Sequence, residues 1–151
     1  MNLVNEKILH IIDTTPLVSI DLIIKNSEQQ VLLGKRVNRP AKDFWFVPGG
    51  RIRKNERLAD AVKRISVHEL GFVLEKNAGK MLGAYDHIYP DNFLDHPKIN
   101  THYVALGYEF QLSSPPKIEL DHQHEEVKWF AIEALLQSEN VHDNTKAYFL
   151  P

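Results

Sequence analysis

The sequence predicts a mixed α/β (α+β) domain in which one mixed β-sheet lies between helices on both faces. Apolar runs of strand length alternate with helical patterns in the order strands, helix, strands, helix. The chain has 151 residues, of which 43% are hydrophobic and 25% charged, so it can bury a sizeable core. We therefore expect residues 1–151 to form a single domain.

The first predicted element is a short amphipathic helix over residues 2–12, which ends before Pro16. Its packing residues are expected to be Leu3, Ile8, Ile11 and Ile12.

Two strand-like runs follow, over residues 17–24 and from residue 31 to 33, with a polar turn between them. They are predicted to pair as a hairpin. Asp21 is unusual in the first run because its neighbours are apolar. After a loop, residues 44–47 form a short predicted strand, which Pro48-Gly49-Gly50 breaks.

Residues 57–70 give the clearest helical pattern, and Gly71 stands where a left-handed cap ends a helix. Leu58, Val62 and Ile65 form its apolar stripe. Glu69 lies 11 residues beyond Leu58, about 20° from it at about 100° per residue. A carboxylate on a buried stripe needs a partner. It is either a salt bridge or solvent contact at the last turn, or a metal ligand that faces a cleft.

The rest of the chain is predicted to return to the sheet and end in helices. The expected elements are strands over 80–89 and 101–112 around a loop at 91–100, a long polar loop over 113–126, a strand over 127–130, a helix over 131–138 and a last turn at 144–149.

Composition excludes several classes of protein. The net charge is −2 and no basic stripe is present, which argues against polymeric nucleic acid as a partner. The absence of Cys excludes disulfides and thiolate metal sites and fits a reducing cytoplasm. Neither a signal-like N-terminus nor an apolar run of membrane-spanning length is present, so we expect a cytoplasmic protein without a membrane partner.

The most specific local motif runs from Gly50 through the predicted helix. Gly50 is followed by five residues, Glu56, seven residues, Arg64, and then residues 65–72. This resembles the Nudix box, G-x5-E-x7-R-E-U-x-E-E-x-G-U, where U is aliphatic, and implies a Nudix-type α/β/α sandwich. Ile65 and His68 replace two family carboxylates and Ser66 replaces an aliphatic residue. Since those carboxylates hold divalent metals in the family, the changes imply fewer metal ions.

A wider likeness covers nearly the whole chain and is similar to the GDP-mannose mannosyl hydrolase branch of that superfamily. It comprises residues 15–19 with Asp21, then 32–36, 38–41, 45–51, His87, Tyr89, 91–93, 101–104, 123–124 and 143–150. The resemblance implies that water attacks the anomeric carbon of a GDP-sugar with inversion, releasing GDP. It also implies one Mg²⁺ per subunit, with Mn²⁺ as an alternative, and a homodimer with the N-terminal helix as a plausible contact.

The same resemblance implies a role for each site residue. His124 is the general base, with His122 as its rival, since imidazole has a pKa near neutrality. Cations should converge on the departing GDP, and Asp21 should stabilise positive charge on the sugar. The other implied residues are Arg36, Arg51 and Tyr103 at the diphosphate; His87, Tyr89 and Arg64 in substrate binding, Arg64 also pairing with Glu56; and the Gly49 carbonyl, Glu69 and Gln123 as metal ligands.

Alternatives stay open at this point. Asp21 could be bonded to backbone, and Arg36 and Arg51 could be solvated loop charges. The domain could also be a Nudix pyrophosphohydrolase that cleaves at phosphorus, or a nucleotide-binding domain without catalysis.

Overall fold

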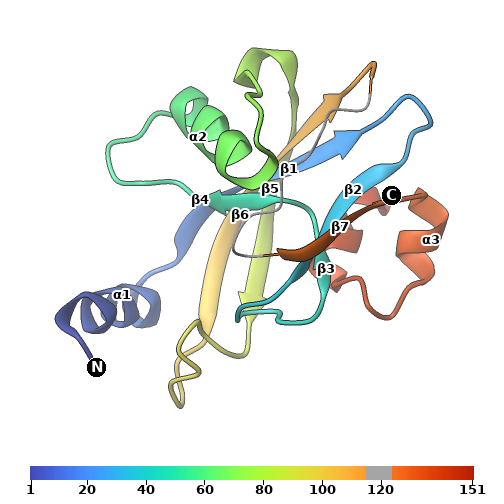
Figure 1. Ribbon diagram of the computed structural model, residues 1–151. Coiled ribbons are helices and arrows are strands. Elements are labelled where there is room, and N and C mark those ends of the chain that lie inside the picture. The colour runs from blue at the N-terminus through green and yellow to red at the C-terminus, as the bar shows by residue number, and fades with distance from the viewer. Residues whose placement is uncertain (115–123) are drawn as a thin grey trace.

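The structure is a computed structural model that describes residues 1–114 and 124–151, apart from the side chains of residues 124 and 125. Within these residues, seven strands form one mixed sheet, and the path β3-β2-β1-β6-β5 is extended by β4 on β1 and β7 on β2 (Figure 1). The elements are α1 (Leu3–Thr14), β1 (Leu17–Lys25), β2 (Val31–Arg36), β3 (Trp45–Phe46), β4 (Gly49–Arg51), α2 (Leu58–Leu70), η1 (Lys76–Ala78), β5 (Lys80–Tyr89), β6 (Thr101–Gln111), β7 (His124–Phe130), α3 (Ile132–Gln137), α4 (Asp143–Lys146) and η2 (Ala147–Phe149).

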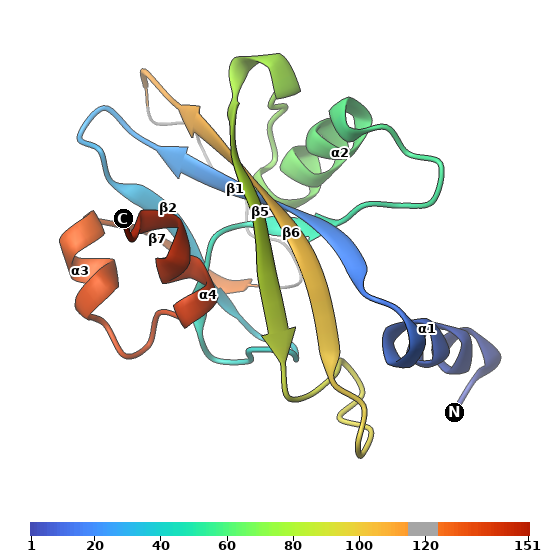
Figure 2. The ribbon, with the colours of Figure 1, turned by 180° about the vertical axis from the view of Figure 1, so that it is seen from behind.

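Helices cover both faces of the sheet, which confirms the predicted sandwich. On one face, Ile20, Leu22 and Leu32 pack against Val62 and Ile65 of α2. Figure 2 shows α3 and α4 on the opposite face. There a second core holds Ile23, Val31, Leu33, Val47, Leu135, Val141 and Tyr148. Because β1 is buried from both sides, its residues alternate between two cores rather than between core and solvent.

Strand β1 lies at the centre and has different partners along its length. It pairs in parallel with β6 from Leu17↔Tyr103 to Lys25↔Gln111. Its middle pairs antiparallel with β4, and it meets β2 only at Lys25↔Val31. The predicted hairpin is therefore present only at its turn, because β2 diverges from β1 to pair with β3 and β7.

Three local predictions were wrong. The Gly49-Gly50 segment does not merely break a strand, since Gly49–Arg51 forms β4 against β1. The loop expected through residue 126 ends earlier, because β7 begins at His124. In α1, Ile12 is buried as predicted, but Leu3 and Ile11 are exposed and Leu9 is buried instead, because α1 projects at the edge of the domain (Figure 1).

Helix α2 ends as predicted. Gly71 has φ +81° and its N–H donates to the Val67 carbonyl oxygen. Ser66, which departs from the family's aliphatic residue, is fully buried, and its Oγ accepts a hydrogen bond from the Leu74 N–H at 2.9 Å. The hydroxyl therefore fixes the chain as it leaves the helix.

Among the described residues, no helix is both long enough and apolar enough to span a membrane.

Replacing Gly71 with Ala should lower the free energy of unfolding by about 1 kcal/mol, because a Cβ is strained at this positive φ. Urea denaturation measures the change. Gly71→Asn is the matched control and should lose less, since Asn tolerates the left-handed region better. Equal losses in the two variants would contradict this explanation.

Candidate active site

A cavity of about 200 Å³ opens where β1, β4, β5 and β6 meet the loop after β2. It brings together seven of the predicted site residues, from five separate segments of the chain. They are Asp21, Arg36, Gly49, Arg51, His87, Tyr89 and Tyr103. Sheet register explains part of this convergence, because Asp21 pairs with Gly49 and His87 pairs with Tyr103.

Asp21 lies at the floor of the cavity and is 7% exposed. Its Oδ2 accepts a hydrogen bond of 2.6 Å from the Tyr148 hydroxyl, so its partner is a side chain rather than the backbone. Burial raises the pKa of Asp21 from 3.8 to about 7, while the Tyr148 hydrogen bond and Arg36 oppose the rise. The carboxyl group is therefore close to half-protonated at neutral pH.

Gly49 is required beside this carboxyl group. A Cβ on Gly49 would lie 2.5 Å from Asp21 Oδ1 and 2.6 Å from the Ile20 carbonyl oxygen. Gly107 leaves room for Tyr148 in the same way, because a Cβ on Gly107 would lie 2.6 Å from the Tyr148 ring. Two glycines thus leave room for the Asp21–Tyr148 pair.

The aromatic groups around Asp21 are held in their neutral forms. Burial, with a smaller effect from His142, lowers the pKa of His87 to about 4. His87 Nδ1 lies 3.7 Å from Asp21 Oδ2, and its buried Nε2 has no hydrogen-bond partner among the described residues. Burial also raises the pKa of Tyr89 and Tyr103. The cavity therefore offers polar groups that can bond to an uncharged ligand such as a sugar.

Positive charge comes from Arg36 and Arg51 at the cavity wall. Arg36 Nε donates to the Pro40 carbonyl oxygen at 2.9 Å, which orients its guanidinium. The backbone carbonyl of Arg51 accepts from Arg64 at 2.8 Å, and Arg64 also binds Glu56 at 2.7 and 2.9 Å. The sequence predicted this ion pair.

Arg64 lies in an adjoining hollow of about 230 Å³, beside Glu69 and Gly50. Its hydrogen bond lowers the pKa of Glu56 to about 2, which keeps the carboxylate ionised at neutral pH. Because the same guanidinium holds the backbone of Arg51, Arg64 ties the loop after β4 onto α2.

Glu69 is the candidate metal ligand that the structure describes best. It is 3% exposed, its Oε1 accepts from the Gly49 N–H at 3.3 Å, and its Oε2 has no hydrogen bond among the described residues. His68 Nδ1 lies 3.5 Å from that oxygen. A buried carboxylate oxygen beside the Gly49 backbone fits a hard divalent cation, which takes carboxylate and carbonyl oxygens.

The two replaced box positions lie differently. Ile65 is buried, and its side chain lies 3.1 Å from where a Cβ of Gly50 would be. His68 is about half exposed. No three His, Asp or Glu side chains form a metal cluster in the part of the chain that the structure describes. The two candidate ligands that the structure describes, Gly49 and Glu69, thus offer one backbone carbonyl and one carboxylate.

The predicted base, His124, is the first residue of β7. Its side chain lies outside the described part of the chain, as do Gln123, the predicted third metal ligand, and His122. The backbone of His124 pairs with Arg36 of β2, which lines the cavity.

Sequence reasoning missed Tyr148 as a site residue. It lies 127 residues from Asp21, and although residues 143–150 belong to the family resemblance, nothing in the sequence assigned Tyr148 a role. His142 was missed too, although its ring lies 4.9 Å from that of Phe46, which lines the cavity. Only the packing of α4 and η2 under the sheet reveals either residue.

Comparisons with known proteins agree on one family. The model of the NUDIX domain matches residues 15–151. Low-salt glycan biosynthesis protein Agl8 of Haloferax volcanii is 40% identical over 120 residues, which cover 80% of this chain and 74% of that protein.

Two solved structures extend the likeness to the fold. A MutT NUDIX hydrolase from Burkholderia pseudomallei is 28% identical, with a TM-score of 0.71 over 89% of this chain and 95% of that one. The NUDIX domain of Shewanella oneidensis NrtR, solved with ADP ribose, is 21% identical, with a TM-score of 0.67 over 90% and 86%.

The buried carboxyl group predicts a pH-dependent stability. Because the folded-state pKa of Asp21 is about 7 and the unfolded value is near 3.8, its protonated form stabilises the fold fully below about pH 4. That contribution, up to about 4 kcal/mol at about 1.4 kcal/mol per pKa unit, is lost as pH rises through 7. Asp21→Asn should therefore gain stability relative to the wild type between pH 4 and pH 8.

Urea unfolding at pH 4, 6 and 8 measures the difference between the two proteins. His87 is present in both, so its own opposite pH dependence largely cancels. Asp60→Asn, on the exposed face of α2, serves as the control for the loss of a surface carboxyl group. A difference between Asp21→Asn and the wild type that does not change with pH would contradict the elevated pKa.

Proposed function

Because the chain belongs to the Nudix family of hydrolases, we propose that it hydrolyses a GDP-sugar, GDP-mannose or GDP-glucose, by attack of water at the anomeric carbon with inversion. The water oxygen bonds to that carbon, the bond from the carbon to the phosphate oxygen breaks, and GDP leaves with the electron pair. The products are GDP and free sugar.

The single observation that carries the proposal is the combination found in the main cavity. A buried acid and a neutral imidazole, Asp21 and His87, lie 3.7 Å apart at its floor, and two guanidinium groups, Arg36 and Arg51, lie at its wall. The floor suits an uncharged ring that develops positive charge, and the wall suits a diphosphate. A sugar nucleotide carries both parts.

The leaving group needs positive charge at its phosphates. Arg36 and Arg51 supply it, and Tyr103 can donate a hydrogen bond because its raised pKa keeps the phenol protonated. The Gly49 carbonyl, Glu69 and Gln123 would hold one Mg²⁺, or Mn²⁺ in its place. A bound divalent cation supplies further charge neutralisation for the departing diphosphate.

The sugar side depends on the state of Asp21. A sugar that loses its leaving group acquires oxocarbenium character. Positive charge near this carboxyl group lowers its pKa, so the ionised form of Asp21, already present near neutral pH, is the form that stabilises the developing charge. Tyr148 then stabilises that carboxylate through its 2.6 Å hydrogen bond. In this proposal His87 and Tyr89 bind sugar hydroxyls, and Arg64 acts on the substrate indirectly, through Arg51.

The general base in this proposal is His124, which takes a proton from the attacking water. The backbone of His124 pairs with that of Arg36, so the strand that carries the proposed base lies beside a strand that lines the main cavity. His122 is the alternative.

Two further features belong to the proposal. The name of the relative Agl8 refers to glycan biosynthesis, which supports a role near sugar-nucleotide turnover. The exposed Leu3, Val4 and Ile11 of α1 would supply the contact of a homodimer. We also place the protein in the cytoplasm, on the absence of Cys from the sequence.

The second candidate function is cleavage at phosphorus, giving GMP and a sugar phosphate, and family membership favours it. Ile65 and His68 weigh against it, since they stand where that chemistry has metal-binding carboxylates. A binding domain without catalysis is the third candidate.

Hydrolysis of GDP-mannose with Mg²⁺ in ¹⁸O-labelled water separates the three candidates by mass spectrometry. We expect the label in mannose and none in the nucleotide, with the inverted anomer formed first by NMR. Label in a phosphate would establish cleavage at phosphorus, and no turnover would leave only a binding function. Glu69→Gln, which lacks the carboxylate proposed to bind the metal, should abolish most turnover at low Mg²⁺. It serves as the control for hydrolysis that does not depend on this site.

His124→Gln should lower kcat by ~10²–10⁴, which is the usual contribution of a general base, while Kd for GDP changes little. Steady-state kinetics and calorimetry with GDP measure the two effects. His122→Gln is the matched control in the same segment and should keep most activity. The assignment is wrong if His122→Gln shows the large loss and His124→Gln does not.

A further inference from the structure

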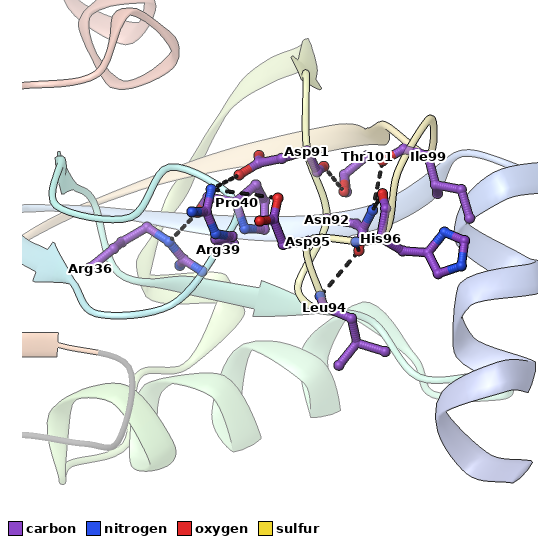
Figure 3. Close-up of polar contacts among 10 residues, drawn as sticks. All are labelled: Arg36, Arg39, Pro40, Asp91, Asn92, Leu94, Asp95, His96, Ile99 and Thr101. Atoms are coloured by element: carbon purple, nitrogen blue, oxygen red, sulfur yellow. Dashed lines mark hydrogen bonds and ion pairs between the residues drawn. The ribbon is translucent and has the colours of Figure 1, made fainter. Parts of the chain in front are cut away.

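One ion pair joins two loops that are far apart in the sequence. Arg39, in the loop after β2, lies 3.0 Å from Asp91 and 3.8 Å from Asp95, both in the loop after β5 (Figure 3). Arg39 and Asp91 are separated by 52 residues. We call this Arg39–Asp91–Asp95 contact the loop clasp. Neither loop contacts the reacting atoms in the proposed function, and that function assigns no role to the loop clasp.

The Asp91 side of the clasp is held firmly. Asn92 is fully buried, and its Nδ2 donates to the carbonyl oxygens of His96 and Ile99 at 2.9 and 2.7 Å. Its Oδ1 accepts from the N–H groups of Leu94 and His96 at 3.1 Å each. Figure 3 shows this amide at the centre of the loop. The four hydrogen bonds of this single side chain thus hold the loop in addition to its backbone hydrogen bond from Asp95 N–H to the Asn92 carbonyl oxygen.

Thr101 completes that anchor, because its Oγ1 donates to the Asp91 carbonyl oxygen at 2.7 Å. The Asp91 carboxylate therefore extends from backbone that is fixed on both sides, and it offers Arg39 an acceptor in a defined place.

On the other side of the clasp, Arg39 is connected to the active site through the residue that follows it. The next residue, Pro40, provides the carbonyl oxygen that accepts from Arg36 Nε at 2.9 Å. The backbone of Arg36 is bonded to the same loop, through its N–H to Phe44 and its carbonyl to Asp43, each at 2.9 Å. The position of the Pro40 carbonyl, and with it the direction of the Arg36 guanidinium, thus depends on where the clasp holds Arg39.

A second hollow, of about 490 Å³, lies between the clasped loops and α1. It shares Arg36, Arg51 and Tyr103 with the main cavity, so the two are continuous at the cations. Its remaining walls include the apolar Ile8, Ile12 and Phe93 and the amide of Asn38. An apolar wall with a few polar groups, next to a cationic neck, suits a nucleoside whose diphosphate lies at Arg36 and Arg51.

We propose that Arg39 is a positioning residue: through Asp91 and Asp95 it holds the Pro40 carbonyl so that Arg36 meets the diphosphate, and it keeps the two walls of the second hollow together around the nucleoside. This inference rests on the proposed function for the identity of the ligand. The competing role is direct contact, in which Arg39 itself binds phosphate and Asp91 merely occupies it until substrate arrives.

The variant Asp91→Asn separates the two roles. It weakens the clasp but leaves the Arg39 guanidinium intact. Positioning predicts weaker nucleotide binding, whereas direct contact predicts equal or tighter binding, because Arg39 is released. The pair is partly exposed, with side-chain exposures of 44% and 23%, so we expect an effect of about fivefold in Kd, near 1 kcal/mol.

The experiment measures Kd for GDP with Mg²⁺ by calorimetry in the full-length protein. Arg39→Met and Asp91→Asn should each raise Kd about fivefold, and the double variant should be no worse than either single one. Arg39→Lys should recover part of the affinity. Lys63→Met is the matched control, because it removes one positive charge and one surface ion pair, with Glu75, on α2. In turnover of GDP-mannose, KM should rise while kcat stays within about threefold.

A second readout needs no ligand. Hydrogen exchange of residues 36–44 should be faster in Arg39→Met and in Asp91→Asn than in the wild type, and unchanged in Lys63→Met. Unchanged exchange in the clasp variants would overturn the proposal, as would unchanged or tighter GDP binding by Asp91→Asn. If the wild type neither binds GDP nor hydrolyses GDP-mannose, the proposed function fails by itself, and the exchange result still decides whether the clasp orders the loop.

Discussion

The site depends on one buried hydrogen bond, from the Tyr148 hydroxyl to Asp21 in the middle of β1. A carboxyl group between two hydrophobic cores is costly unless it is neutral or bonded. Here it is both partly protonated and bonded, since burial raises its pKa to about 7 and Tyr148 opposes the rise. The packing around it follows, because Gly49 and Gly107 can carry no side chain where the pair lies. The C-terminal helices are thus coupled to the floor of the cavity.

A second set of contacts fixes the other wall. Glu69 accepts from the Gly49 N–H, and Arg64 joins Glu56 to the Arg51 carbonyl, so α2 is bonded to β4 and to the loop after it. Short strand β4 is in turn paired with β1 at Asp21. Asp21, proposed to act on the sugar, and Glu69, proposed to bind the metal, are therefore both held at Gly49 of the same three-residue strand. A shift in the position of either carboxyl group should therefore move the other through Gly49.

Sequence reasoning succeeded where a feature depends on neighbours in the chain. Helix α2, its cap at Gly71 and the limits of β5 follow from periodicity and turn chemistry, and Glu69 was found because it interrupts an apolar stripe. The misses are long-range. The sequence predicts a turn at Gly49–Arg51, whereas the strand there depends on pairing with β1. The early start of β7 likewise depends on its pairing with β2. Leu3 and Ile11 fit a helical stripe, but they are exposed among the described residues. Tyr148 and the loop clasp join residues 127 and 52 positions apart, which no local pattern encodes.

The distribution of charge also bears on why one carboxylate on α2 can suffice. Attack at phosphorus brings a nucleophile to an anionic centre, so both must be neutralised there. Attack at an anomeric carbon divides the electrostatic requirements between two places. The leaving group needs cations, and the sugar ring needs a nearby carboxylate. The cavity is divided in the same way, with Arg36 and Arg51 at its wall and Asp21 at its floor. Since Ile65 is buried in the core beside Gly50, restoring a carboxylate at that position would place a charge among apolar side chains. Regaining that particular carboxylate would then require repacking under β4.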